Sequence, residues 1–336
     1  MALRTIQVGL GGWGRDWAKQ VIPDIESVEL VGYVDPDASS LELLTGDLPR
    51  FTSFAKALNE LDAEAVVVTA GVAAHVPVVR EALRADKHVL VEKPFAPTVA
   101  EATELVALAA ERGRTLMVSQ NYRYFPAPRA VQQLVAQQEL GALYQIDVEF
   151  RRLSIARPGH PSPHHAYAQP LLDDMSIHHF DLLRFVVGEP ASSIVCRTWN
   201  PPASGFAGPP AAAALITVGN VNVSYRGSWV SREARTPWAG EWRMAFEKGD
   251  VAWTSRDDQD RAAVDSVTVT VDGVGSELAL PAMRWIDRWG TLNEFADAVL
   301  SKRVPECSGA DNIGSLALRS AAIESAATGD VVALTD

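Results

Sequence analysis

The chain has 336 residues and a formal net charge of −12 at pH 7, with 47% hydrophobic and 21% charged residues. A chain of this length is too long for one ordinary hydrophobic core, so two domains are expected, and the composition is that of a globular protein. The negative charge provides no electrostatic footprint for nucleic acid or for an anionic membrane, which excludes both as expected partners.

The number of cysteines and the length of the apolar runs indicate the expected cellular location. Cys196 and Cys307 lie far apart in the sequence, so no disulfide framework is expected, and a reducing cytoplasm is the expected location. The first residues lead directly into a strand and a glycine turn, without the pattern of a secretory signal. The longest apolar run, residues 63–79, is interrupted by Glu64 and Pro77 and is not expected to span a bilayer.

The first 120 residues alternate between expected strands and helices. The strands are expected at residues 4–11, 28–35, 49–54 (a minor strand), 63–70, 88–93 and 114–121. The helices are expected at residues 12–22, 74–86 and 98–113. Because the strands are continuously apolar and separated by helices, they predict a parallel sheet covered on both faces.

A glycine-rich turn joins the first expected strand to the first helix. Its residues are Gly9, Leu10, Gly11, Gly12, Trp13 and Gly14, in the pattern G-x-G-x-x-G. The first glycine permits a tight turn, the second lets the backbone approach a pyrophosphate at the helix N-terminus, and the third lets helix and strand pack closely. We therefore predict an α/β fold that begins with a Rossmann dinucleotide-binding domain over residues 1–120. The alternative is a glycine turn needed only for packing.

Two aspartates after the second strand favour NAD over NADP. Asp35 ends the strand where a carboxylate can accept hydrogen bonds from a ribose diol. Asp37 adds a second negative charge that would repel a 2′-phosphate, whereas Arg15 could still reach one. The alternative interpretation is that Asp35 caps the following helix.

The stretch HVLVEKPF, residues 88–95, places a lysine where a buried strand ends. Ligands of open α/β sheets bind beyond the carboxyl ends of the strands, so the Lys93 ammonium is expected to point into the crevice where a nicotinamide lies. Pro94 restricts Lys93 to non-helical backbone angles, which ends the strand there. The alternative is a surface lysine that pairs with Glu92.

From residue 121 onward the pattern changes. A helix is expected within residues 120–141 and two more within 291–329. Segments with period-two patterning and glycine turns predict an antiparallel or mixed sheet. These segments are residues 142–153, 192–200, 212–230, 241–254 and 265–273. We predict that residues 121–336 form an α+β substrate-binding and oligomerisation domain with a large open, mostly antiparallel sheet. An uncovered apolar sheet face would favour a homodimer or homotetramer.

A helical pattern over residues 171–185 carries Asp174, His178 and Asp181 at positions i, i+4 and i+7. One continuous helix would place all three on one face. Histidine titrates near neutral pH, and a carboxylate one turn away can fix its tautomer and stabilise its charged form. This pairing suits removal of a hydroxyl proton while hydride leaves the same carbon.

Two other interpretations of this stretch stay open. One is an N-terminal helix cap followed by a hydrogen-bonded core histidine. The other, less favoured, is a metal site, although no further Cys/His cluster supports it and no resident metal is expected. A separate group, His160, His164 and His165, lies in a proline-rich stretch and is interpreted as solvated loop residues.

Taken together, these residues resemble the Gfo/Idh/MocA family, the group of glucose–fructose oxidoreductase and inositol dehydrogenase. The motif HVLVEKP and the stretch DMSIHHFD carry the most specific resemblance, the latter to a D-x-G-x-H-x-x-D signature. The resemblance implies that Lys93 binds the reacting hydroxyl and that His178 exchanges its proton with support from Asp174. It also implies cofactor contacts from the glycine turn, Asp35, His75, Glu92 and Lys93. Two residues depart from the family pattern, since Val72 replaces an asparagine and Ser176 replaces a glycine.

We therefore expect a dehydrogenase that acts on a secondary alcohol of a sugar, cyclitol or related polyol. The sequence favours NAD as its cofactor, with NADP as the alternative. Candidate pocket residues are Tyr122, Arg123, Tyr144 and Asp181. Two alternatives stay open. One is a glycoside-cleaving or epimerising enzyme that retains NAD through a redox cycle. The other is a non-catalytic regulatory protein that binds NAD or sugar on the same scaffold.

Overall fold

The computed structural model describes residues 2–155, 163–202 and 204–334, and the chain divides into two compact units. The first unit contains Met1–Asn121 and Arg288–Ile313, and the second contains Tyr122–Asp287 and Gly314–Asp336. The predicted boundary at residue 120 lies beside the first division. The predicted second domain, residues 121–336, is interrupted, because residues 288–313 return to the first unit.

Specific contacts hold this returning segment within the first unit. The guanidinium of Arg288 lies 4.2 Å from the ring centre of Trp13. The Trp289 indole nitrogen donates to Asp24 at 2.8 Å. The amide of Val118 donates to the carbonyl of Cys307 at 2.9 Å. Contacts between residues so far apart in the sequence leave no local pattern, so the sequence did not predict them.

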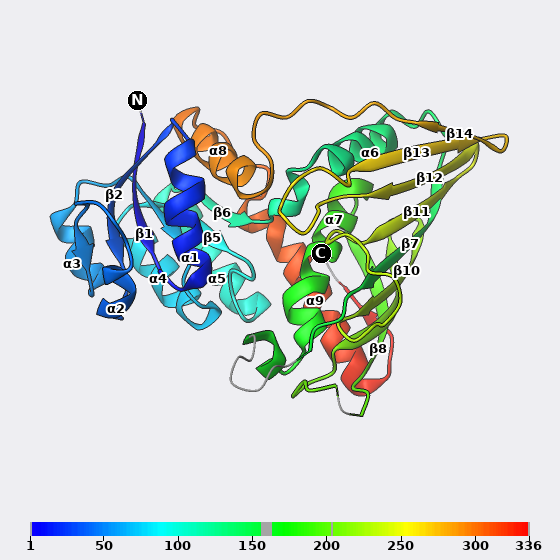
Figure 1. Cartoon of the computed structure of the whole chain (residues 1–336), viewed down its shortest axis with the longest axis horizontal. Helices are drawn as coiled ribbons and strands as arrows, with labels where there is room; N and C mark the ends of the chain where they lie inside the picture. The colour runs from blue at the N-terminus through cyan, green and yellow to red at the C-terminus, as the bar shows by residue number, and fades with distance from the viewer. Residues whose placement is uncertain (1, 156–162, 203, 335–336) are drawn as a thin grey trace. The chain divides into compact units, whose positions relative to one another are not determined.

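The first unit is built on six parallel strands in the order β3-β2-β1-β4-β5-β6 (Figure 1). The strands are β1 (Leu3–Val8), β2 (Val28–Val34), β3 (Arg50–Phe51), β4 (Ala65–Val68), β5 (His88–Glu92) and β6 (Leu116–Ser119). The helices are α1 (Gly12–Asp16), which continues as a π turn over Trp17–Val21, α2 (Ala38–Glu42), α3 (Phe54–Glu60), α4 (Val72–Arg84), α5 (Val99–Arg112) and α8 (Asp287–Leu300). This is the predicted doubly covered parallel sheet.

Local signals explain where these elements begin and end. All four residues of β4 are buried, as expected for a strand covered on both faces. Helix α5 begins after Thr98, whose side chain accepts from the amide of Glu101, and ends at Gly113, which has φ +60°. The short helices α2 and α3 were not predicted, although Asp37 and Ser53 cap them in the usual way.

The second unit contains a nine-stranded sheet in the order β14-β13-β12-β11-β7-β10-β9-β8-β15 (Figure 1). Its strands are β7 (Leu143–Arg151), β8 (Ala191–Trp199), β9 (Ala211–Val218), β10 (Val221–Ser228), β11 (Glu241–Phe246), β12 (Gly249–Thr254), β13 (Ser266–Val271), β14 (Val274–Glu277) and β15 (Val332–Ala333). Strands β7 and β10 run parallel, and the other neighbouring pairs are antiparallel. The predicted fold class is confirmed.

Three helices cover one face of this sheet. They are α6 (Pro126–Gln137), α7 (Ile177–Val187) and α9 (Gly309–Thr328), the last of which begins in the first unit. Val131 of α6, Leu182 of α7 and Leu318 of α9 share one core with Val148 and Val223 of the sheet. Each such side chain contributes roughly 1.5–3 kcal/mol by burial, so this core fixes α7 on the sheet.

The outer face of the sheet differs from the expectation. The exposed positions of β10 are Asn222, Ser224 and Arg226, and Arg226 pairs with Glu149 of β7. Leu215 is an exposed apolar side chain of β9. An uncovered apolar face therefore gives no argument for oligomerisation along β10, because the polar groups there are compatible with water. A homodimer or homotetramer stays a prediction.

Among the helices of residues 2–155, 163–202 and 204–334, none is both long and apolar enough to cross a membrane. Cys196 and Cys307 are buried and are not joined in a disulfide.

Candidate active site

The glycine turn after β1 combines close packing with open space. Gly9 has φ +95°, and a Cβ there would lie 2.3 Å from backbone atoms of Ala70. A Cβ on Gly14 would lie 2.1 Å from the carbonyl oxygen of Gly9. In contrast, no atom lies within 4 Å of a Cβ built on Gly11 or Gly12. The first and third motif glycines therefore serve packing, whereas the middle pair faces open space, and the turn fits a dinucleotide pyrophosphate.

Asp35 braces this turn against the end of β2. One carboxylate oxygen accepts from the amide of Leu10 at 2.6 Å, and the other accepts from the amide of Asp37 at 2.9 Å. The cap of α2 is Asp37, which accepts from the amide of Ser39, so the interpretation of Asp35 as a helix cap is wrong. Each carboxylate oxygen of Asp35 has a second lone pair, so its predicted contact with a ribose diol remains compatible with these bonds.

The charges beside Asp35 bear on the choice of cofactor. Hydrogen bonds from the side chain and amide of Ser39 lower the pKa of Asp37, which keeps that carboxylate negative at neutral pH. The guanidinium of Arg15, the alternative phosphate ligand, donates to the carbonyl of Leu10 at 2.9 Å. These contacts agree with the predicted preference for NAD and do not test it.

Glu92 gathers donors from the helical segment after the glycine turn and from β6. Its Oε1 accepts from the indole nitrogens of Trp13 at 2.9 Å and Trp17 at 3.0 Å, and from the hydroxyl of Ser119 at 3.3 Å. This buried carboxylate therefore braces the end of β5, immediately before the half-buried Lys93. A direct contact between Glu92 and a cofactor stays a prediction.

His75 holds the backbone around Lys93. Its Nδ1 lies 2.8 Å from the carbonyl oxygen of Pro94, and its Nε2 lies 2.9 Å from that of Ala70. Burial lowers the pKa of His75, and the two carbonyl contacts oppose this effect. Both ring nitrogens thus face backbone carbonyls, so His75 fixes the segment that follows Lys93. Its contact with a cofactor stays a prediction.

Gln120, directly after β6, is a site residue that the sequence did not single out. It is 1% exposed, and neither its side-chain nitrogen nor its oxygen has a hydrogen-bond partner among the described residues. An unsatisfied buried amide costs about 1–3 kcal/mol per polar group. It offers one donor group and one acceptor, the complement of another carboxamide such as that of nicotinamide. Only the three-dimensional environment reveals this, since glutamine carries no motif.

In the second unit, His178 lies against Tyr122. The two rings are stacked, with centroids 4.1 Å apart and planes 6° from parallel. The guanidinium of Arg256 donates to the Tyr122 hydroxyl at 2.9 Å and lies 4.6 Å from the ring centre. Burial raises the pKa of Tyr122, so the phenol stays protonated at neutral pH. Tyr122 thus supports the imidazole, and Arg256, which was not predicted, supports Tyr122.

Asp174 does not lie on a regular α-helix. It belongs to a π turn over Leu172–Ser176, and α7 begins only at Ile177. The π turn changes the angular spacing along the helical run, and the placing of Asp174 and His178 on one face stays a prediction. The charge of Asp174 raises the pKa of His164 against the larger opposing effect of burial. Turns of this type are frequent at functional sites.

Arg123 and Asp181 form a buried ion pair with one another. The two hydrogen bonds between them are both 2.6 Å, and their side chains are 4% and 1% exposed. Asp181 also accepts from the hydroxyl of Ser315 at 2.8 Å. The role of these two residues in a substrate pocket stays a prediction. They tie the segment before α6 to α7 and α9, and breaking such a pair costs about 3–5 kcal/mol.

Tyr144 lies at the other end of its strand from the site. It is 49% exposed near the start of β7, whereas Phe150 near the end of β7 contacts the ring of His179. Six residues of strand separate them by about 20 Å at ~3.3 Å per residue. This position gives no support to Tyr144 as a pocket residue, which stays a prediction.

The histidines of the proline-rich stretch are packed rather than solvated. His164 stacks on Trp229 with centroids 4.9 Å apart, and His165 lies 4.5 Å from Phe206 and is 6% exposed. Both imidazoles contact the hydroxyl of Ser154, at 3.0 and 3.1 Å. The interpretation of solvated loop residues is wrong for these two, because aromatic rings cover them. His160 lies outside the described residues.

Ser176, which replaces the family glycine, enters a buried hydrogen-bond chain. Its hydroxyl lies 2.9 Å from that of Tyr225, which lies 3.1 Å from Nδ1 of His179. Nε2 of His179 donates to the carbonyl of Trp238 at 3.0 Å. Burial lowers the pKa of His179 to about 4, so this imidazole is neutral at pH 7. The serine therefore helps to fix the loop that carries Trp238.

Within the described parts of the chain, no group of three or more His, Cys, Asp or Glu residues is arranged to hold a metal ion.

The parallel sheet, the open glycine turn and the second sheet together define an NAD-binding oxidoreductase of Rossmann type. Residues 3–120 match the family model described as oxidoreductase family, NAD-binding Rossmann fold, and residues 129–252 match the GFO/IDH/MocA C-terminal domain. The chain belongs to the Gfo/Idh/MocA oxidoreductase family, which confirms the resemblance seen in the sequence.

Individual relatives agree with this assignment. An uncharacterised protein of Sinorhizobium fredii is 25% identical over 99% of this chain and 96% of its own length. Inositol 2-dehydrogenase 1 of Paenarthrobacter aurescens is 27% identical over 61% of this chain and 60% of that enzyme. The crystal structure of an Agrobacterium radiobacter oxidoreductase in complex with NAD+, L-tartaric acid and magnesium has a TM-score of 0.86. It is 20% identical, over 99% of this chain and 98% of that one. This last likeness concerns the fold.

Proposed function

We propose that this protein is an NAD-dependent dehydrogenase acting on a secondary alcohol of a sugar, a cyclitol or a related polyol. The observation that carries the proposal is the position of Lys93 at the carboxyl end of β5, in the same sheet as the turn that is open at Gly11 and Gly12. Because open α/β sheets bind ligands beyond these strand ends, the amine and a dinucleotide would share one crevice.

The proposed chemistry divides between two side chains. Bound NAD would supply the hydride acceptor. The ammonium of Lys93 donates to the substrate oxygen and stabilises negative charge that develops there, an effect worth about 3 kcal/mol for one well-placed donor. The imidazole of His178, held by Tyr122, takes the hydroxyl proton, and the charge of Asp174 favours the protonated imidazole that results. Convergence of Lys93 and His178 on one carbinol is part of the proposal.

Two further points support the choice of cofactor and substrate. The carboxylates of Asp35 and Asp37 disfavour a 2′-phosphate, which supports NAD over NADP. A relative that matches about three fifths of the chain is named inositol 2-dehydrogenase, which supports a polyhydroxylated substrate.

A substrate panel tests the proposal directly. The purified protein is incubated with NAD+ or NADP+ and a set of sugars, cyclitols and polyols, and reduced nicotinamide is followed by absorbance. We expect reduction of NAD+ with at least one secondary alcohol. Conversion of a substrate without net formation of NADH would contradict a dehydrogenase and favour a retained-cofactor cycle instead.

A further inference from the structure

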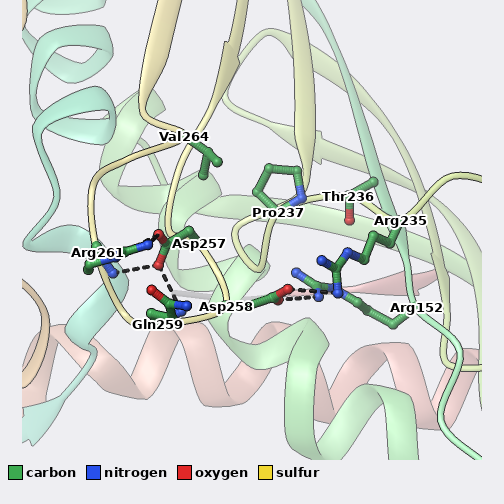
Figure 2. A pocket seen from close by; sticks show the side chains of 9 residues that line it. All are labelled: Arg152, Arg235, Thr236, Pro237, Asp257, Asp258, Gln259, Arg261 and Val264. Carbon is green, nitrogen blue, oxygen red and sulfur yellow. Dashed lines mark hydrogen bonds and ion pairs between the residues drawn. The ribbon is translucent and has the colours of Figure 1, made fainter.

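A polar cavity of about 320 Å³ lies in the second unit, beyond the end of β7 (Figure 2). It lies between the turn before β11 and the loop after β12. Its lining residues are Arg152, Arg235, Thr236, Pro237, Asp257, Asp258, Gln259, Arg261 and Val264. Three guanidinium groups therefore face two carboxylates, in a chain whose overall charge is strongly negative.

Figure 2 shows that the carboxylate of Asp258 lies between two arginines. It pairs with Arg152 and, at 2.7 Å, with Arg235. Asp257 pairs separately with Arg261 at 3.0 Å. Since one carboxylate serves two guanidinium groups, one positive charge in the cavity has no counter-charge among the described residues that line it. A bound oxyanion would supply it.

Arg152 is a buried and fixed side chain in the cavity wall. Its side chain is 9% exposed, and its Nε has no hydrogen-bond partner in the described part of the chain. The guanidinium lies 4.2 Å from the ring centre of Trp238, which holds its plane in place. Burying a cation is costly, and a rigid planar fork is suited to carboxylate or phosphate groups.

Packed side chains of the same unit lead from the cavity wall to the candidate catalytic histidine. Trp238, against which Arg152 lies, is also 5.8 Å from the guanidinium of Arg256. Arg256 donates to the hydroxyl of Tyr122, and Tyr122 stacks on His178. A substrate whose carbinol lies at His178 could extend along Trp238 and place a distal group in the cavity.

We propose that the substrate carries an oxyanion, a carboxylate or a phosphate, and that Arg152 and Arg235 bind it. The substrate class would then be an acidic sugar or polyol, such as an aldonate, a uronate or a sugar phosphate. This inference rests on the proposed dehydrogenase function. In the free protein Asp258 neutralises the arginine pair, and a bound oxyanion competes with it. A neutral hydroxyl would gain much less, because hydrogen bonds between two charged groups are about twice as strong as neutral ones.

The test measures binding to the full-length protein saturated with NADH, by calorimetry at constant ionic strength. The probes are D-gluconate for a carboxylate, D-glucose 6-phosphate for a phosphate, and D-glucose as the neutral match. We expect at least one anionic probe to bind about tenfold more tightly than D-glucose, as one charge-assisted hydrogen bond predicts. The tighter of the two anions identifies the group.

Three variants assign the effect to the cavity. Arg235 is exposed, so Arg235→Gln should fold normally and weaken anion binding about tenfold. Asp258→Asn removes the internal competitor and should tighten anion binding several-fold. Arg226→Gln, on the outer face of β10, removes an equal charge elsewhere and should change nothing. Equal binding of neutral and anionic probes, or equal effects of Arg235→Gln and Arg226→Gln, would overturn the proposal.

Failure of this inference can be told apart from failure of the proposed function. Anion binding that depends on Arg235, without hydride exchange on any probe, would support the subsite and refute the dehydrogenase. Turnover of an anionic probe that is unchanged in Arg235→Gln would support the dehydrogenase and refute the subsite.

Discussion

Tyr122 lies flat against His178, with ring centroids 4.1 Å apart, and its hydroxyl accepts a hydrogen bond from Arg256. Tyr122→Phe keeps the stack, whereas Tyr122→Leu removes both contacts. Because aromatic pairs contribute about 0.5–1.5 kcal/mol, we expect Tyr122→Leu to lower kcat/KM by up to tenfold and Tyr122→Phe to lower it less. NADH affinity should not change in either variant. If Tyr122 had a purely structural role, Tyr122→Leu and Tyr122→Phe would lose thermal stability equally. The pH profile of kcat would then be the same in both variants as in the wild type.

Lys93→Met should retain NADH binding within about twofold and lower turnover by roughly a hundredfold, since the ammonium is assigned to the transition state. Stopped-flow hydride transfer and NADH fluorescence titration measure the two quantities separately. Lys56→Met, on the exposed surface of α3, is the matched control and should behave like wild type. Equal turnover of Lys93→Met and wild type would refute the assigned role.

The glycine turn predicts opposite consequences for the same substitution at two positions. Gly14→Ala places a methyl group 2.1 Å from the carbonyl of Gly9 and should lower the free energy of unfolding by about 1–3 kcal/mol. Gly11→Ala meets open space, so stability should change by less than about 0.5 kcal/mol. NADH affinity of Gly11→Ala should fall about tenfold, because its methyl group occupies the space assigned to the pyrophosphate. Chemical unfolding measures the stability of both variants, and NADH titration measures their affinity for the dinucleotide. Normal NADH binding by Gly11→Ala would place the dinucleotide elsewhere.

Asp37→Asn separates the charge of Asp37 from its capping role, since asparagine caps helices about as well as aspartate. We expect an unchanged melting temperature and a several-fold gain in NADPH affinity relative to NADH. Asp62→Asn, an exposed aspartate near the amino ends of the strands, is the control and should leave the ratio unchanged. A gain in NADPH affinity of equal size in both variants would point to overall charge instead.

Stability should fall as the pH falls below about 6.5, because the unfolded chain then binds a proton at His179 that the folded chain does not. The pKa of His179 is lowered by burial to about 4. His75, whose pKa burial also lowers, acts in the same direction. The His179 contribution is therefore present above about pH 6.5 and is lost towards pH 4, by up to roughly 3 kcal/mol. The free energy of unfolding is measured by urea titration at several pH values from 7.5 to 5. It should depend less steeply on pH in His179→Gln than in the wild type. An identical slope in both proteins would mean that His179 is charged when folded.

The glycine turn, the parallel strands and Lys93 at the end of β5 were predicted from the sequence, because each depends on a local or periodic pattern. Val66 and its neighbours are apolar in succession since both faces of β4 are covered. The period-two pattern of β10 likewise predicted a strand of an antiparallel or mixed sheet. Gly9 and Gly14 have the spacing that a strand–turn–helix crossing requires.

Tertiary structure alone decided which polar groups of the candidate site face one another. Arg123 and Asp181 lie 58 positions apart and neutralise each other in the core, and Arg256 reaches Tyr122 across 134 positions. The π turn at Asp174 and the orphaned amide of Gln120 also carry no sequence signal. The physical reason is that backbone angles and the burial of single strands follow from neighbouring residues. Pairing of charges depends instead on distances between segments that only the folded core brings together.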